Sequence, residues 1–163
     1  MLVLALETST DNGACALWHD GRVCERVCPP GVPHSETLLP LVRDLMAEAG
    51  IGFGSLDGIA FGAGPGAFTG LRIACGVAQG LAVAADLPVA PVCGLEALAA
   101  ANGAMQALAL LDARMGEVYA AAYRRADDGS LAAAGAIVVA APDAVPLPGG
   151  SAWVACGNAA SAY

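Results

Sequence analysis

The stretch that decides the fold is GAGPGAFTGLR, residues 62–72, which joins a short apolar run to a longer run of small and apolar residues. Residues 59–61 are expected to form a buried strand, and residues 71–85 a helix. A glycine-rich loop between them brings backbone close to a phosphate and directs helix N–H groups at it. Its glycines also permit positive φ angles and close packing of the helix, so both interpretations stay open. The loop residues singled out are Gly64, Pro65, Gly66, Thr69 and Gly70.

The rest of the first hundred residues alternates strand and helix patterns. Asp20-Gly21 is a strong hairpin signal between two short apolar runs. Residues 35–49 have helical spacing, with Ser35 as the N-cap and Gly50 as the C-cap. The expected elements are strands at 2–6, 14–18, 22–28, 59–61 and 88–92 and helices at 35–49, 71–85 and 95–101. This order predicts an α/β fold with a mixed sheet flanked by helices.

The second part of the chain is shorter and richer in strand patterns. Strands are expected at 108–111 and 117–123, and further apolar runs occupy residues 131–140 and 153–155. The change in the order of elements places a boundary near Asn102-Gly103. We therefore expect an N-terminal domain over residues 1–102 and a second domain over 103–163.

Composition excludes several classes of site. The chain has 163 residues, 57% of them hydrophobic, and its seven basic residues are all Arg. Without Lys there is neither a Walker lysine nor Schiff-base chemistry, and two His without an H-E-x-x-H motif exclude the common zinc hydrolase arrangements. The net charge of −8 argues against a broad nucleic-acid surface, because only Arg124 and Arg125 are adjacent.

The cysteines and the hydropathy pattern predict the compartment. The six cysteines lack every C-x-x-C spacing and are expected to be buried free thiols. The N-terminus has no basic segment ahead of its apolar run and carries Glu7, which is not typical of a secretory signal. No stretch of about 18 uncharged apolar residues occurs, so we expect no membrane span. A cytoplasmic protein is the resulting prediction.

Four motifs occur along the chain: LETST at 6–10, HSETLLP at 34–40, GPGAFTGLR at 64–72 and LDARMGEVYAA at 111–121. Together they resemble the TsaB (YeaZ) family of the actin, sugar kinase and Hsp70 superfamily. The resemblance implies an actin-like ATPase fold of the ribonuclease H-like type. Family members normally continue past the position of residues 157–159, so the second lobe of this chain is expected to be shortened.

The resemblance also implies a role in tRNA modification. Family members belong to the bacterial machinery that makes N6-threonylcarbamoyladenosine at position 37 of tRNA (t6A37). There a TsaB-like protein is the non-catalytic partner of TsaD, which performs the transfer, and the ATPase TsaE joins the assembly. We therefore expect a TsaD-like partner, a TsaE-like ATPase through the complex, a homodimer of the chain alone, and only indirect contact with tRNA. No tightly bound cofactor is expected, and ATP or ADP would belong to the assembled complex.

No catalytic residue and no metal ligand is assigned. His34 has no second His nearby, and no triad of nucleophile, base and orienting group can be built. The segment that begins at Glu7 occupies the place of a superfamily phosphate loop, so Thr8, Ser9 and Thr10 are candidates for contacting a phosphate. Capping of the turn by these hydroxyls is the alternative. The alternative functions are a weak nucleotide-binding or hydrolysing enzyme of the kinase or glycoprotease-like type, and a nucleic-acid-binding module.

Two helices are candidates for a docking surface. In the second, Gly76, Gly80 and Ala84 recur every fourth residue, and a glycine inside a helix costs about 0.5 to 1 kcal/mol relative to Ala. The glycines therefore face either the protein's own sheet or a partner. The resemblance favours a partner, because family members pair with TsaD or with themselves through these helices. The predicted interface residues are His34, Leu38, Leu41, Leu45, Phe68, Arg72, Cys75, Gly76, Gln79 and Gly80.

Overall fold

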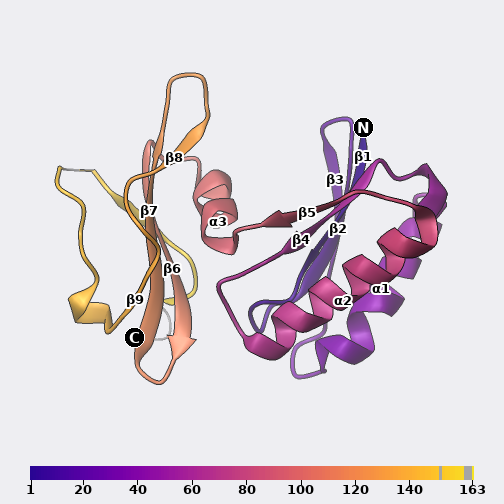
Figure 1. The fold of residues 1–163 in the computed structure, drawn as a ribbon, viewed down its shortest axis with the longest axis horizontal. Coiled ribbons are helices and arrows are strands. Elements are labelled where there is room, and N and C mark those ends of the chain that lie inside the picture. The colour runs from indigo at the N-terminus through magenta and orange to yellow at the C-terminus, as the bar shows by residue number, and fades with distance from the viewer. Residues whose placement is uncertain (151, 160–162) are drawn as a thin grey trace. The chain divides into compact units, whose positions relative to one another are not determined.

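The computed structural model describes residues 1–150, 152–159 and 163, and the chain divides into two compact units, Met1–Val92 and Cys93–Tyr163. Figure 1 shows that each unit contains a β-sheet with helix packed on it. The expected α/β class, with mixed sheets flanked by helices, is confirmed.

The sheet of the first unit has the strand order β3-β2-β1-β4-β5. Its strands are β1 (Leu2–Glu7), β2 (Ala14–His19), β3 (Arg22–Val27), β4 (Gly58–Gly62) and β5 (Val89–Val92). The first three pair antiparallel, whereas β4 lies parallel to both β1 and β5. Asp20 and Gly21 have φ angles of 48° and 84°, as the predicted two-residue hairpin turn requires.

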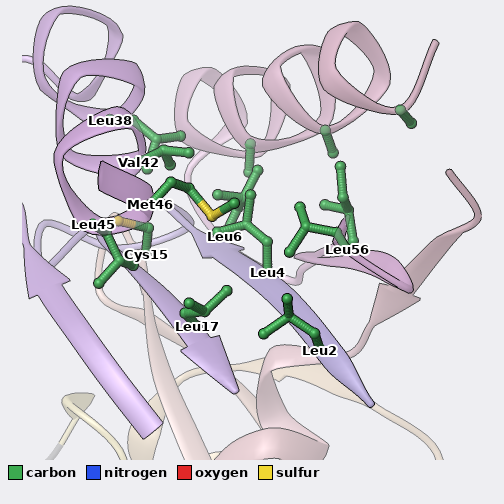
Figure 2. Close-up of a cluster of buried hydrophobic side chains, with 14 residues drawn as sticks. Leu2, Leu4, Leu6, Cys15, Leu17, Leu38, Val42, Leu45, Met46 and Leu56 are labelled. Carbon is green, nitrogen blue, oxygen red and sulfur yellow. The ribbon is translucent and has the colours of Figure 1, made fainter. Parts of the chain in front are cut away.

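Helices α1 (His34–Glu48) and α2 (Phe68–Ala85) cover one face of this sheet, and a short 3-10 turn, η1 (Phe53–Ser55), precedes β4. In Figure 2, Leu38 and Val42 of α1 point toward Leu6 of β1. Alternation along β1 buries Leu2, Leu4 and Leu6 beneath the helices. The packed core thus determines which side of each helix faces the sheet and which side stays exposed.

The second unit has a sheet of order β10-β6-β7-β8, with β9 also paired to β7. Its elements are α3 (Gly94–Asn102), β6 (Gln106–Arg114), β7 (Glu117–Arg125), β8 (Leu131–Ala133), β9 (Val138–Ala140), the 3-10 turn η2 (Pro142–Ala144) and β10 (Val154–Cys156). Leu95 and Ala99 of α3 are buried against β6 and β7. The division between the units therefore falls between Val92 and Cys93, ahead of α3, whereas the expected boundary lay after it.

Three local expectations need correction. Helix α1 begins at His34 with Pro33 as its N-cap residue, so Ser35 lies inside the first turn. Helix α2 begins at Phe68 rather than at residue 71, and Gly70 packs within its first turn against the loop after β1. The C-cap residue of α1 is Ala49, so Gly50, the expected C-cap, is the residue after it. The apolar run 131–140 forms two short strands, β8 and β9.

All six cysteines are free, as expected, but they are not all buried. Cys15 and Cys28 lie in the interior, whereas Cys24 is exposed on β3 because that strand forms the edge of the sheet. Burial raises the pKa of the Cys15 thiol to about 11, with a smaller contribution from neighbouring Cys28. The thiol of Cys15 is therefore protonated and unreactive at neutral pH.

Among the described helices, α2 is long and apolar enough by length and composition to cross a membrane, with a mean hydropathy of 1.4 over 18 residues. The expectation of no membrane span rested on the lack of an uncharged apolar stretch of about 18 residues, and Arg72 lies within α2. Length and composition are weak indicators here, since a core helix of a soluble protein passes the same test. The absence of a membrane partner stays a prediction.

Candidate functional site

The loop after β1 and the loop before α2 are bound directly to each other. The amide of Ala67 donates to the Ser9 carbonyl at 2.7 Å, and the Thr8 hydroxyl donates to the Gly70 carbonyl at 2.7 Å. A Cβ at Gly70 would overlap the Thr8 carbonyl oxygen, and one at Gly66 would meet Ser9. These contacts support the interpretation of the glycine loop as a close backbone packing device.

Thr8 and Ser9, two of the candidates for contacting a phosphate, are buried, and that role stays a prediction. Their side chains are 1% and 4% exposed, and the Thr8 hydroxyl already donates within the protein. The hydroxyl of Thr10 accepts a hydrogen bond from the Asn12 amide at 3.2 Å. The Glu7 carboxylate accepts from the Ser9 amide. Glu7 and Thr10 therefore cap their own turn, which was the alternative interpretation, whereas the Thr8 hydroxyl binds the first turn of α2.

The remaining members of the glycine loop shape the approach to α2. Gly64 has a φ of 98°, a conformation that favours glycine. Its bond to Pro65 is cis, and Thr69 is exposed in the first turn of α2. The loop is thus built around glycines at its buried positions and presents Thr69 at the surface.

Helix α2 has two unlike faces. Gly70, Ala74, Ala78 and Ala82 are buried on the side that faces the sheet. The opposite side, which we call the α2 outer face, is formed by exposed residues from both ends of the helix. Its members are Phe68, Arg72, Gly76, Gln79, Gly80 and Val83.

The two glycines of the α2 outer face make no close packing contact with the residues that the structure describes. A Cβ at Gly76 or at Gly80 would meet nothing within 4 Å. The alternative that these glycines pack on the protein's own sheet is therefore wrong. At one end of this face, the Arg72 guanidinium lies 3.9 Å from the centre of the Phe68 ring, a cation–π arrangement that keeps the charge over an aromatic surface.

The predicted interface residues of α1 separate into two groups. Leu38 and Leu45 are 1% and 2% exposed, because both belong to the core that α1 forms with the sheet. Neither is available for docking, so both predictions are corrected. Leu41 is half-buried and packs against the same core. The helical spacing of the apolar residues predicted that they share one face of α1, but it did not show that this face packs on the sheet.

Cys75 is half-buried beside the α2 outer face, and His34 is half-buried at the start of α1, where it binds the loop after β1. Val83, which is 86% exposed, was absent from the predicted interface residues. Its place one turn beyond Gln79 is a helical-spacing signal that could have found it. Leu39, which is 49% exposed on α1, was absent as well.

The LDARMGEVYAA motif forms the hairpin between β6 and β7. Arg114 and Met115 have φ angles of 66° and 55°, and Met115 is 99% exposed at the tip. The Asp112 carboxylate accepts from the Arg114 amide at 2.7 Å and from the Tyr163 hydroxyl at 2.9 Å. The hydrogen bond from the Arg114 amide is the main reason that the pKa of Asp112 is lowered. This network stabilises the base of the hairpin.

The described residues contain no cluster of His, Cys, Asp or Glu that could hold a metal ion. A largely apolar hollow of about 370 Å³ lies on the second unit beside Leu110, Val118 and Leu147. None of the predicted site residues lines it. The geometry thus leaves the α2 outer face as the candidate functional surface.

Comparisons with known proteins agree with this fold. The family model for TsaD, described as tRNA N6-adenosine threonylcarbamoyltransferase, matches residues 31–159. The tRNA threonylcarbamoyladenosine biosynthesis protein TsaB of Escherichia coli (strain K12) is 43% identical over 135 residues, which cover 79% of this chain and 58% of the relative. TsaB of Haemophilus influenzae is 42% identical over 123 residues, which cover 73% of this chain and 52% of the relative.

Among solved structures, YeaZ from Pseudomonas aeruginosa superposes with a TM-score of 0.88 at 43% identity, covering 96% of this chain and 76% of that one. This match fits the actin-like ATPase, or ribonuclease H-like, fold that the motifs implied. The chain spans 58% and 52% of the two curated TsaB relatives. Because the chain is 43% identical to YeaZ and covers 76% of that structure, it belongs to the TsaB (YeaZ) family.

Proposed function

We propose that this chain is a non-catalytic partner of a TsaD-like subunit in the synthesis of t6A37 in tRNA, and that it docks through the α2 outer face. The names of the relatives support the pathway, since both are tRNA threonylcarbamoyladenosine biosynthesis proteins. The observation that carries the docking role is the open space in front of Gly76 and Gly80 on an exposed helix face.

The chemistry of this face suits an apolar helix of the partner. Phe68 is 67% exposed and Val83 is 86% exposed, so both offer apolar area that a partner would cover. Between them, the two glycines allow another backbone to approach closely. Arg72 is the cation of the face and stacks on Phe68, which leaves its N–H groups able to donate to a carboxylate of the partner. A second copy of the chain would occupy the same face when the partner is absent.

A non-catalytic role is supported by the burial and the internal hydrogen bonds of the loop after β1. The hydroxyls that could have contacted phosphate are buried or used within the turn. In this proposal ATP or ADP belongs to the assembled complex, which a TsaE-like ATPase joins, and the chain works in the cytoplasm. Wild type and Glu7→Ala are expected to show the same background rate in steady-state ATPase and peptidase assays.

The proposal that the chain contacts tRNA only indirectly is supported by the contacts that its two adjacent arginines make within the chain. The Arg125 guanidinium donates to the carbonyls of Ala99, Ala100 and Gly129. Arg124 lies 5.3 Å from the ring centre of Trp153. Both side chains are engaged within the second unit, and at a net charge of −8 the long-range field of the chain repels phosphate.

The test is Gly76→Arg, with Gly54→Arg as the matched control. Gly54 is exposed in η1 and also has open space in front of it, but it lies outside the α2 outer face. Burying an unpaired charge at a helix contact costs several kcal/mol, so Gly76→Arg is expected to weaken association at least about a hundredfold. Sedimentation with and without a TsaD-like subunit measures this, and thermal melts check the fold.

Gly54→Arg is expected to associate as wild type does. A Gly76→Arg protein that melts normally and still pairs like wild type would show that the docking surface lies elsewhere. If Gly76→Arg melts early, Val83→Arg on the same face provides the second measurement, since Val83 is mostly exposed and a change there leaves the core intact.

A further inference from the structure

His34 makes a hydrogen bond whose direction the geometry determines. Its Nε2 lies 2.9 Å from the carbonyl oxygen of Thr10. A carbonyl oxygen only accepts, so Nε2 carries the proton. Its other ring nitrogen, Nδ1, is buried and has no hydrogen-bond partner in the part of the chain that the structure describes. The ring is thus attached to the loop through one donor.

The ring of His34 packs directly against Gly13. A Cβ at Gly13 would lie 2.7 Å from the His34 ring, so only glycine leaves room for it. The Gly13 carbonyl accepts from the Cys28 amide at 2.7 Å, which ties this end of the loop to the residue after β3. The packing of the ring against Gly13 and the hydrogen bond from His34 Nε2 to Thr10 together hold the start of α1 against residues 10–13.

The same loop holds the start of α2. Ser9 accepts from the Ala67 amide immediately before α2, and Thr8 donates to Gly70 in the first turn. Thr10, the acceptor for His34, is the next residue along the backbone. Residues 8–13 therefore connect the N-terminal ends of α1 and α2 through a short series of hydrogen bonds.

We propose that His34 is a positioning residue that locks α1 to the loop holding α2, and thereby sets the position of the first turns of α2. Phe68 and Arg72 of the α2 outer face lie in those turns. The inference rests on the proposed function, because it assigns the docking surface a support that does not itself touch the partner. The predicted interface role of His34 is replaced by an indirect one.

Three substitutions of His34 distinguish the effect of its Nε2–H donor from the effect of its ring packing. His34→Gln keeps an N–H donor near the place of Nε2, His34→Phe keeps a ring against Gly13 without the donor, and His34→Ala removes both. Hydrogen exchange at the Ala67 amide reports the contact between the loop and α2. Sedimentation with the TsaD-like subunit reports docking, and thermal melts report folding.

We expect His34→Phe and His34→Ala to raise the exchange rate of the Ala67 amide about tenfold and to weaken association about fivefold, as the loss of one hydrogen bond implies. His34→Gln is expected to restore both quantities toward wild type. Unchanged exchange and association in His34→Phe would overturn the inference, and so would a Gln variant no better than the Phe variant. Loss of the folded state in both His34→Phe and His34→Ala would overturn it as well, since His34 would then be a core residue.

The Gly76→Arg protein distinguishes this inference from the proposed function. If Gly76→Arg pairs like wild type, the docking surface is wrong, while exchange at Ala67 still decides whether His34 holds α2. If Gly76→Arg fails to pair and the His34 variants pair and exchange like wild type, only the positioning role fails.

Discussion

Gly70 and Gly76 belong to the same helix and face opposite environments. A Cβ at Gly70 would overlap the Thr8 carbonyl oxygen, whereas a Cβ at Gly76 would meet nothing within 4 Å. Glycine at position 70 is required by a contact inside the chain, and glycine at position 76 is not. A glycine in a helix therefore indicates a close approach, but only the fold shows whether the approaching backbone belongs to the same chain.

The largest expected effect comes from filling the inner contact. Gly70→Ala places a methyl group against backbone that cannot move without breaking the bonds between the two loops. We expect the free energy of unfolding to fall by about 3 kcal/mol. Urea denaturation measures it, with Gly80→Ala as the control on the open side of the helix. A Gly70→Ala protein as stable as the control would show that the two loops are not in contact.

The contrast between buried and exposed positions also predicts that the thiols of Cys15 and Cys24 behave differently. Burial raises the pKa of Cys15 to about 11, so its contribution to stability is complete below the unfolded-state pKa and is lost as pH rises toward 11. The expected loss is about 2 kcal/mol. Cys15→Ala should flatten the decline in urea midpoint between about pH 9 and pH 11 relative to wild type. An equally steep decline in the variant would assign the alkaline loss to other groups.

At neutral pH the same contrast is expected in labelling with a thiol reagent. Exposed Cys24 should react in the folded protein, whereas buried Cys15 should react only after unfolding. Cys24→Ser provides the control, because it should remove the fastest phase and leave the slower labelling of the half-buried and buried thiols.

The smallest expected effect is on the open face. Gly80→Ala adds a methyl group where nothing lies within 4 Å, so helix propensity alone decides the change. We expect the free energy of unfolding to rise by about 0.5 to 1 kcal/mol, measured by urea denaturation. If a partner backbone approaches this face closely, the variant should associate more weakly although it is more stable. A variant that is less stable than wild type would mean that Gly80 packs inside the chain.

The elements of the fold could largely be read from local sequence. The apolar run at residues 2–6, the Asp20-Gly21 turn and the helical spacing after Pro33 each have a local physical cause, and the structure confirms the elements they predict. The first residue of α2 was harder to predict, because a glycine such as Gly70 is typical of a loop. Only the tertiary structure shows that Gly70 lies in the helix, next to the Thr8 carbonyl. The four motifs alone were sufficient to predict the TsaB (YeaZ) family.

The sequence by itself determined the composition of the candidate surface, including the spacing of Gly76 and Gly80 on one side of a helix, because helical periodicity is a property of the chain alone. Only the tertiary structure decided which apolar residues are accessible. Leu38 and Leu45 are buried and Val83 is exposed, since the packing of α1 and α2 on a common sheet orients each helix. It likewise decided that Thr8 and Ser9 bind the glycine loop, because that contact joins segments far apart in the chain.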